Sequence, residues 1–439
     1  MGNAKAKIWN YTLKRMTIFL TVALFFFLAL VPNLCRSTDI SFSSKTYLLY
    51  NKQGVPGSPT KTFAPLYEYF SADARQLGGS SFSFHFYGWG RTDLQDQTGD
   101  GKTTGELGSA YLQYLHPKGN GEMRLGRFFL SEGAAMEIVD GIYLKGRTAM
   151  GLGASIFGGA PAEDSITATK TGDSIYGGRL FYAKPGLTEF GLSYLQEKGA
   201  FQGKDRTEVG GDLWLRPAKF MELIGRATYN EATRAMASQR YLLRLTPVKV
   251  VDLSIGYEAY SYKDLFQTAL NSAFQFPSLD EKDKVQTAFA IMEWEFMKSV
   301  FLVLGVKNIK HDALAIGNAN RGELGLKFTY NNLRDAAGVS TAFVSADRNE
   351  NAYQEFRGYA TYSPAQWRFT LDALTQQYQQ SINAVSQSYQ IVGSLGYKLS
   401  EAMQLSGDLR YTKSPRYDED YAGFIRISLL FGTATGGKK

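Results

Sequence analysis

Apolar and polar side chains alternate along most of this chain, in segments of about ten residues separated by turns. Residues 323–330 (ELGLKFTY) put Leu324, Leu326 and Phe328 on one face and Lys327 on the other, because successive side chains of a strand point to opposite faces. The pattern returns at residues 221–230, 251–260, 367–375, 389–398 and 403–411. Segments of this length cross a bilayer when tilted, whereas a soluble sandwich normally has shorter strands. The pattern therefore predicts membrane-spanning strands with one apolar side.

Between residues 80 and 431 we count about 20 such segments, joined alternately by tight turns and longer polar connections. An open sheet edge in hydrocarbon would leave backbone groups unpaired, so the sheet must close on itself. The sequence thus predicts an all-β, single-chain antiparallel transmembrane β-barrel with an even number of strands, about 18–20. The even count requires residues 137–144 to form a strand. If they fold inward instead, another segment, such as residues 45–50, must join the barrel.

The two ends of the chain differ from the alternating part. Basic residues precede an apolar run at residues 16–31, which is typical of an export signal that is cleaved near Ser37. A retained anchor helix is the alternative, although a membrane-spanning helix needs roughly 20 apolar residues. We expect residues 1–37 to be a signal peptide, 38–79 a periplasmic lead or a plug in the lumen, 80–431 the barrel and 432–439 a short tail. This predicts a bacterial outer-membrane protein with both chain ends in the periplasm.

Aromatic residues gather at segment ends, where transmembrane barrels carry girdles at the headgroup level. Taken singly, each is equally compatible with ordinary packing, but as a set they favour girdles. The expected girdle residues are Tyr87, Trp89, Tyr229, Tyr257, Trp294, Tyr330, Trp367, Tyr397, Tyr411 and Phe431.

Composition excludes several classes of function. The formal net charge is +7, but five basic residues lie in the predicted signal, which leaves +2, so bulk charge gives no case for nucleic-acid binding. Cys35 is the single cysteine and lies in the predicted signal. A mature chain without cysteine has no disulfide, no thiolate metal site and no covalently attached haem. We therefore expect no cofactor of its own.

The polar faces of the predicted strands would line the interior. They carry bases and acids in nearly equal numbers, which is typical of a water-filled channel with weak ion preference, since selectivity arises from rings of one sign. The alternative is that these charges only pair with one another. Arg240 and Arg244, on one face, are candidates for an anion contact. The predicted pore-lining residues are Arg124, Asp140, Arg179, Glu222, Arg226, Arg240, Arg244, Glu293, Glu295, Lys327, Arg357, Arg368, Asp372, Asp408, Arg410 and Arg426.

One short stretch resembles a known family. Residues 123–127 (MRLGR), followed by Asp140 and Gly141, are similar to an R-L-G-R and D-G arrangement near the start of Gram-negative outer-membrane porin-like barrels, including the alginate-exporter family. The likeness covers about twenty residues and implies a porin-like barrel, in agreement with alternation over the whole chain. The assignment of Arg124 and Asp140 to the pore rests on this resemblance together with alternation.

Catalytic and metal-binding motifs are scarce. His85, His116 and His311 are the only histidines, and no metalloprotease, nucleophile-elbow or phosphate-loop motif accompanies them. A barrel hydrolase would have to use His85 or His311, and we expect no enzyme. Asp96 and Asp100 lie in a segment that is similar to part of a calcium loop, with an ordinary Asp-Gly turn as the alternative.

These observations predict a channel for passive or weakly selective passage of small hydrophilic solutes or ions, in contact with outer-membrane lipid. Residues 264–284 contain apolar side chains that are unusual for a solvated loop, so they are a candidate constriction or partner contact. The alternative function is a structural sheath, similar to the porin-like barrels that enclose multihaem c-type cytochromes in extracellular electron conduits. The sequence leaves the solute, the partner and the oligomeric state open.

Overall fold

A computed structural model describes residues 39–54, 60–95, 103–162, 173–201, 204–262, 283–312, 317–331, 334–415 and 417–433. None of the helical segments among these residues is long and apolar enough to span a membrane. The strands are β1 (Asp39–Gly54), β2 (Lys61–Phe63), β3 (Pro65–Arg75), β4 (Phe82–Asp93), β5 (Thr103–Leu115), β6 (Gly121–Glu132), β7 (Ala135–Arg147), β8 (Leu152–Pro161), β9 (Ser174–Lys184), β10 (Thr188–Phe201), β11 (Lys204–Ala218), β12 (Met221–Asn230), β13 (Ala235–Val248), β14 (Val251–Ser261), β15 (Lys284–Met297), β16 (Val300–His311), β17 (Ala319–Tyr330), β18 (Asp335–Ala346), β19 (Tyr353–Tyr362), β20 (Trp367–Ile382), β21 (Val385–Lys398), β22 (Met403–Ser414) and β23 (Tyr417–Thr433); two 3-10 turns, η1 (Leu77–Gly79) and η3 (Asn349–Asn351), lie between them.

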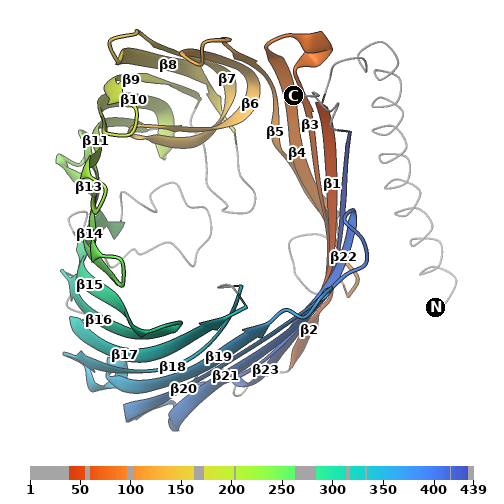
Figure 1. The fold of residues 1–439 in the computed structure, drawn as a ribbon, viewed down its shortest axis with the longest axis vertical. Helices are drawn as coiled ribbons and strands as arrows, with labels where there is room; N and C mark the ends of the chain where they lie inside the picture. The colour runs from red at the N-terminus through yellow and green to blue at the C-terminus, as the bar shows by residue number, and fades with distance from the viewer. Residues whose placement is uncertain are drawn as a thin grey trace, which may run out of the picture.

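The sheet closes into a barrel that Figure 1 shows from one end. Consecutive strands pair antiparallel, and β1 pairs with β23 from Ile40 opposite Thr433 to Gly54 opposite Glu419. Within the described residues β2 pairs only with the end of β1, and Ala64 alone separates it from β3. We therefore count β2 and β3 as one strand of the wall, which gives 22 strands. The prediction of a closed, even-stranded antiparallel transmembrane barrel is confirmed, with a strand number above the expected 18–20.

The two additional strands come from the segment that we expected to be a lead or plug. This expectation is wrong for the described part of residues 38–79, because β1 and β3 pair with each other and belong to the wall. Their alternation is obscured because both faces carry polar or aromatic side chains. Glu68 lies on the outer face, where it accepts hydrogen bonds from Ser44 Oγ and Thr46 Oγ1 at 2.5 Å each. The inner face of the same strands carries Tyr47 and Tyr67.

Beyond β1, β3 and β4, most of the wall is apolar on its outer face and polar on its inner face. On β17, Leu324 and Phe328 are exposed on the outer side. Lys327, on the opposite side, binds Glu293 of β15 with Nζ 2.9 Å from Oε1. This is the distribution that a barrel in lipid requires around an aqueous interior. Residues 1–38 and 434–439, where the signal and most of the tail were predicted, lie outside the described residues.

The hairpin of β6 and β7 bends into the barrel. Its turn residue Ala134 donates its backbone N–H to Ser193 Oγ on β10 at 2.8 Å, although neither strand of the hairpin pairs with β10. Beneath it lies a buried apolar core that includes Phe128, Val139 and Leu195. We call β6–β11 the hairpin lobe; in Figure 1 it contains the strongly curved strands at the upper left.

A row of glycines marks the bend. Gly126, Gly141 and Gly159 are cross-strand partners on β6, β7 and β8. A Cβ on Gly141 would lie 2.1 Å from the carbonyl oxygen of Gly158, and Gly126 has a φ of +123°, which L side chains rarely adopt. Pairing of β5 with β6 stops at Ala110 opposite Arg127, just above the row. The glycines therefore let the upper half of the hairpin leave the wall, as glycine kinks do in curved sheets.

Candidate functional site in the barrel interior

Cross-strand partners lie on one face of a sheet, so the register assigns each side chain to the lumen or to the outer surface. It places the following predicted residues on the inner face: Arg124, Arg179, Glu222, Arg226, Arg240, Arg244, Glu293, Glu295, Lys327, Arg357, Arg368, Asp372, Asp408, Arg410 and Arg426. Asp140 lies on the other side.

The assignment of Asp140 to the pore is wrong. On β7 it shares a face with the exposed Ile142, whereas Val139 and Tyr143 point into the buried core. Asp140 forms a two-bond ion pair with Arg127 on this outer face, with distances of 2.6 and 2.7 Å. Alternation failed here because the inner face of β7 is itself apolar, so both faces of the strand carry hydrophobic residues.

One buried charged group of the lumen is Arg179 on β9, whose side chain is 5% exposed. Its guanidinium binds Asp212, Glu189 at 2.9 Å and Glu132 at 3.3 Å. Glu132 ends β6 and also accepts a hydrogen bond from Tyr143 Oη at 2.6 Å. Because buried charges must be paired to be tolerated, this cluster holds the end of the hairpin against the wall.

A second ion cluster supports the other strand of the hairpin. Arg206 of β11 binds Glu137 of β7 with Nη1 2.6 Å from Oε1. The same guanidinium contacts Glu208 at 2.7 Å and Glu197 at 3.4 Å. The hairpin is thus anchored from β9 to β11 by two separate arginines. It narrows the lumen in the way that we expected of residues 264–284, of which residues 264–282 lie outside the described chain.

Next to the hairpin, three arginines share the inner face of β12 and β13. Arg226 is the cross-strand partner of Arg240, and Arg244 lies four residues further along β13. Arg240 binds Glu258 at 2.9 Å and Arg244 binds Glu222 at 3.3 Å. Arg226 donates Nη1–H to the sulfur of Met136 on the hairpin at 3.0 Å, and the described residues offer it no carboxylate within 4.0 Å. We call Arg226, Arg240 and Arg244 the arginine cluster.

The wall from β15 to β22 carries cross-strand ion pairs with little net charge. They join Lys327 to Glu293, Arg321 to Glu355 and Arg357 to Asp372, and at the edge of this region Arg410 of β22 binds Asp420 of β23. Several of these side chains remain partly exposed, and Arg357 is 50% exposed. Such pairs leave the wall hydrated and close to neutral.

The inner face of β1, β3 and β4 is aromatic, which the sequence interpretation missed. Tyr47, Tyr67 and Tyr69 lay in the segment that was expected to be a plug, and Trp89 was expected in a lipid-facing girdle. The girdle assignment is wrong for Trp89 and Tyr87, because their partners Tyr69 and Ser71 lie on the inner face. Their position near a segment end misled the prediction. The register of neighbouring strands is needed to tell the two faces apart.

The candidate catalytic histidines are occupied by structural contacts. His85 Nδ1 lies 2.5 Å from Asp73 Oδ1, its Nε2 lies 3.1 Å from Gln113 Oε1, and its ring stacks on Tyr111. His311 Nδ1 lies 2.8 Å from Tyr262 Oη; burial raises the pKa of Tyr262 to about 12. Among the described residues, the hydrogen-bond partners of these two rings are Asp73, Gln113 and Tyr262, and none of them is a serine.

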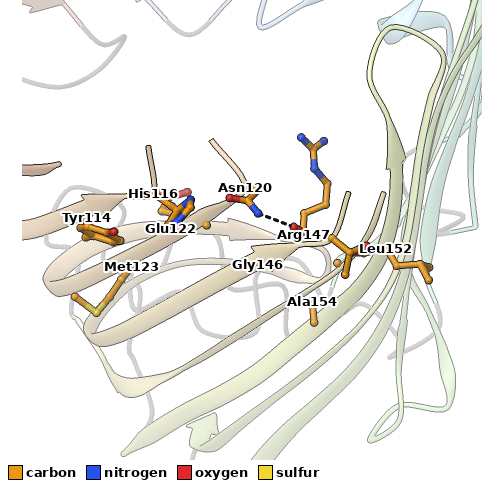
Figure 2. Close-up of a pocket in the computed structure, with 12 residues that line it drawn as sticks. Tyr114, His116, Asn120, Glu122, Met123, Gly146, Arg147, Leu152 and Ala154 are labelled. Carbon is orange, nitrogen blue, oxygen red and sulfur yellow. Dashed lines mark hydrogen bonds between the residues drawn. The ribbon is translucent and has the colours of Figure 1, made fainter. Parts of the chain in front are cut away.

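Metal and pocket candidates add little. Asp96 and Asp100 lie outside the described residues, and the described chain contains no group of three metal-ligating side chains. His116 belongs to an open depression at the tight-turn end of β5–β8, where Asn120 Nδ2 donates to the carbonyl oxygen of Arg147 at 3.2 Å (Figure 2). Arg147 points away from this depression, so its charge does not contribute to a site there (Figure 2).

No family model and no curated protein matches the chain. Among solved structures, it is similar to a BenF-like porin from Pseudomonas fluorescens Pf-5, with 10% identity, a TM-score of 0.46 and coverage of 91% of this chain and 100% of that one. For the outer membrane protein opdK from Pseudomonas aeruginosa, the identity is 10%, the TM-score is 0.42, and 90% of this chain and 99% of that one are covered. For the translocation pore of the P pilus usher PapC, the identity is 10%, the TM-score is 0.44, and 91% of this chain and 100% of that one are covered. At these values the likeness says nothing about the solute.

Proposed function

We propose that this protein is an outer-membrane channel through which small hydrophilic solutes diffuse. The observation that carries the proposal is the exposure of charged side chains on the inner face. Arg240 is 70% exposed there and Arg244 is 57% exposed. A charged group in a dry interior costs several kcal/mol or more, so such side chains require water around them. A closed wall with a hydrated interior and an apolar exterior supports an aqueous path across a bilayer.

The arginine cluster gives this path a weak preference for anions. Glu222 and Glu258 each neutralise one arginine, while Arg226 faces the lumen beside Met136 without a carboxylate partner among the described residues. The inward hairpin brings the aqueous path close to this cluster. Because selectivity depends on charge of one sign at a narrow point, the cluster is the part of the wall that favours anionic solutes.

The orientation in the membrane is part of the proposal. β1 begins and β23 ends at the same end of the barrel, where the connections at residues 185–187, 219–220 and 249–250 are tight. Short turns face the periplasm in outer-membrane barrels. Both ends of the barrel domain then lie in the periplasm, after export directed by residues 1–37. A cytochrome sheath gains no support from any contact of the described residues, since the hairpin occupies part of the lumen.

Reconstitution into planar bilayers tests the proposal. The folded protein is expected to give stepwise conductance with a permeability for chloride above that for potassium. The double variant Arg240→Gln and Arg244→Gln should lower that ratio. Its matched control, Arg216→Gln with Lys219→Gln, removes the same charge near a tight turn and should leave the ratio close to wild type. Folded protein without any conductance would refute the channel.

A further inference from the structure

Five aromatic side chains form a row across four neighbouring strands of the wall. Phe424 of β23, Tyr47 of β1, Tyr69 of β3 and Trp89 of β4 follow one another with ring centroids 5.7, 5.5 and 6.5 Å apart. Tyr67 lies beside them, 6.1 Å from both Tyr69 and Trp89. All five side chains are half-buried, so each ring keeps a free portion. We call these residues the aromatic row.

The row faces the lumen. Arg426, on the inner face of β23, is the cross-strand partner of Tyr47, and its guanidinium carbon lies 5.9 Å from the centre of the Tyr47 ring. The neighbours Leu48 and Tyr50 of β1 point the other way and are exposed on the outer face. β1, β3 and β4 lie on the right of Figure 1, across the barrel from β11 and β13.

Each ring of the central part has a charged residue as its cross-strand partner. Lys45 lies opposite Tyr69, Arg91 opposite Tyr67, Glu106 opposite Trp89 and Arg426 opposite Tyr47. The rings of Tyr67 and Tyr69 are nearly parallel at 12°, and the Trp89 ring lies within 36° of both, whereas Tyr47 is edge-on to Tyr69 at 81°. The lumen therefore contains an apolar row of aromatic rings that is bordered by hydrogen-bonding groups of both signs. The rings lie on β23, β1, β3 and β4, and the charged border extends to Glu106 on β5.

The chemistry of this surface matches one class of solute. A pyranose ring has a face of C–H groups, which is attracted by the negative face of an aromatic ring, and a rim of hydroxyls that donate and accept hydrogen bonds. A flat aromatic solute would use the rings but not the charged border. We infer that the aromatic row binds saccharides during passage and that several successive rings contact an oligosaccharide. The inference rests on the proposed channel and names a solute class for it.

Blocking of single channels by maltohexaose tests this inference. The sugar should interrupt the current of the wild-type channel, and Trp89→Leu should raise the half-blocking concentration about tenfold through the loss of one stacking surface. Leucine keeps an apolar side chain at position 89, and heat-dependent electrophoretic mobility checks folding. The matched control is Phe84→Leu, on the outer face of the same strand, which should leave the block unchanged. Titration calorimetry of the detergent-folded barrel with maltohexaose provides a readout that needs no conductance.

The outcomes separate the two proposals. Normal conductance with neither block nor heat of binding overturns the saccharide site and leaves the channel intact. Equal block of wild type and Trp89→Leu places the sugar elsewhere and also overturns it. Block by phenol but not by maltohexaose assigns the row to flat aromatic solutes instead. Folded protein without conductance refutes the channel, and calorimetry then still decides whether the row binds the sugar.

Discussion

The hairpin lobe and the wall from β15 to β22 are built from the same antiparallel pairs, yet they use their inner faces differently. In the lobe, Phe128, Leu130 and Leu195 are at most 1% exposed, and the buried Arg179 joins three carboxylates. In the wall, the ion pair of Arg357 with Asp372 stays in contact with water. The lobe thus has the interior of a small globular protein, whereas the wall has the interior of a channel.

The difference shows what an inward hairpin requires. Bending a hairpin away from the wall breaks its pairing with β5, and this loss must be offset by new contacts. Burial of a large apolar side chain contributes about 1.5–3 kcal/mol, and the lobe buries several. The ion clusters of Arg179 and Arg206 also fix the position of the hairpin, because they join it to β9 and β11. The regular wall needs none of this, since every strand keeps both neighbours.

Breaking the buried ion cluster should have the largest effect. Arg179→Met leaves Glu132 and Asp212 without their guanidinium, and loss of one partner from a buried pair costs about 3–5 kcal/mol. The matched change in the wall is Arg357→Met, which removes a partly exposed pair and should cost about 1 kcal/mol or less. Unfolding by guanidinium chloride in lipid vesicles, followed by tryptophan fluorescence, measures the free energy of unfolding of both variants. Equal losses would contradict the distinction between lobe and wall.

A methyl group on the glycine row should have the next largest effect. Gly141→Ala places Cβ against the carbonyl oxygen of Gly158, which overpacks the bend and should lower the free energy of unfolding by about 3 kcal/mol. Gly393→Ala on β21 is the control, because a Cβ there meets no atom within 4 Å and the change should stay within about 0.5 kcal/mol. The same unfolding assay applies. A neutral Gly141→Ala would mean that the hairpin does not need the close approach.

Alternation predicted the regular part of the barrel well. β12 coincides with the expected residues 221–230, and Lys327 with Leu326 shows the expected division of faces. Alternation of apolar and polar residues identifies the two faces there because one face meets lipid and the other meets water. The sequence left two alternatives for residues 137–144, a strand of the barrel or a segment folded inward. β7 is both, since it pairs along its length and still enters the lumen with its hairpin.

Where both faces have similar polarity, alternation carries no information. β7 is apolar on both sides because its inner face packs in the lobe, and Asp140 was misplaced for that reason. β1 and β3 are mixed on both sides, so two strands of the wall and the aromatic row escaped notice. Contacts between the hairpin and β9–β11 join residues far apart in the sequence, such as Glu137 and Arg206. No local pattern encodes such pairs.

The smallest effect is expected from locking the hairpin in place. A Cβ on Gly210 of β11 would lie 3.1 Å from Cβ of Ala134 in the hairpin turn and 2.6 Å from Ser193 Oγ, so cysteines at both positions are close enough to be linked once the Ser193 side chain turns aside. In a chain with Cys35→Ser, the pair Ala134→Cys and Gly210→Cys should cross-link on oxidation and leave single-channel conductance unchanged, because the hairpin already rests against the wall. Ala134→Cys alone is the control. A large drop in conductance after oxidation, reversed by reduction, would show instead that the open channel needs a hairpin that moves away from β11.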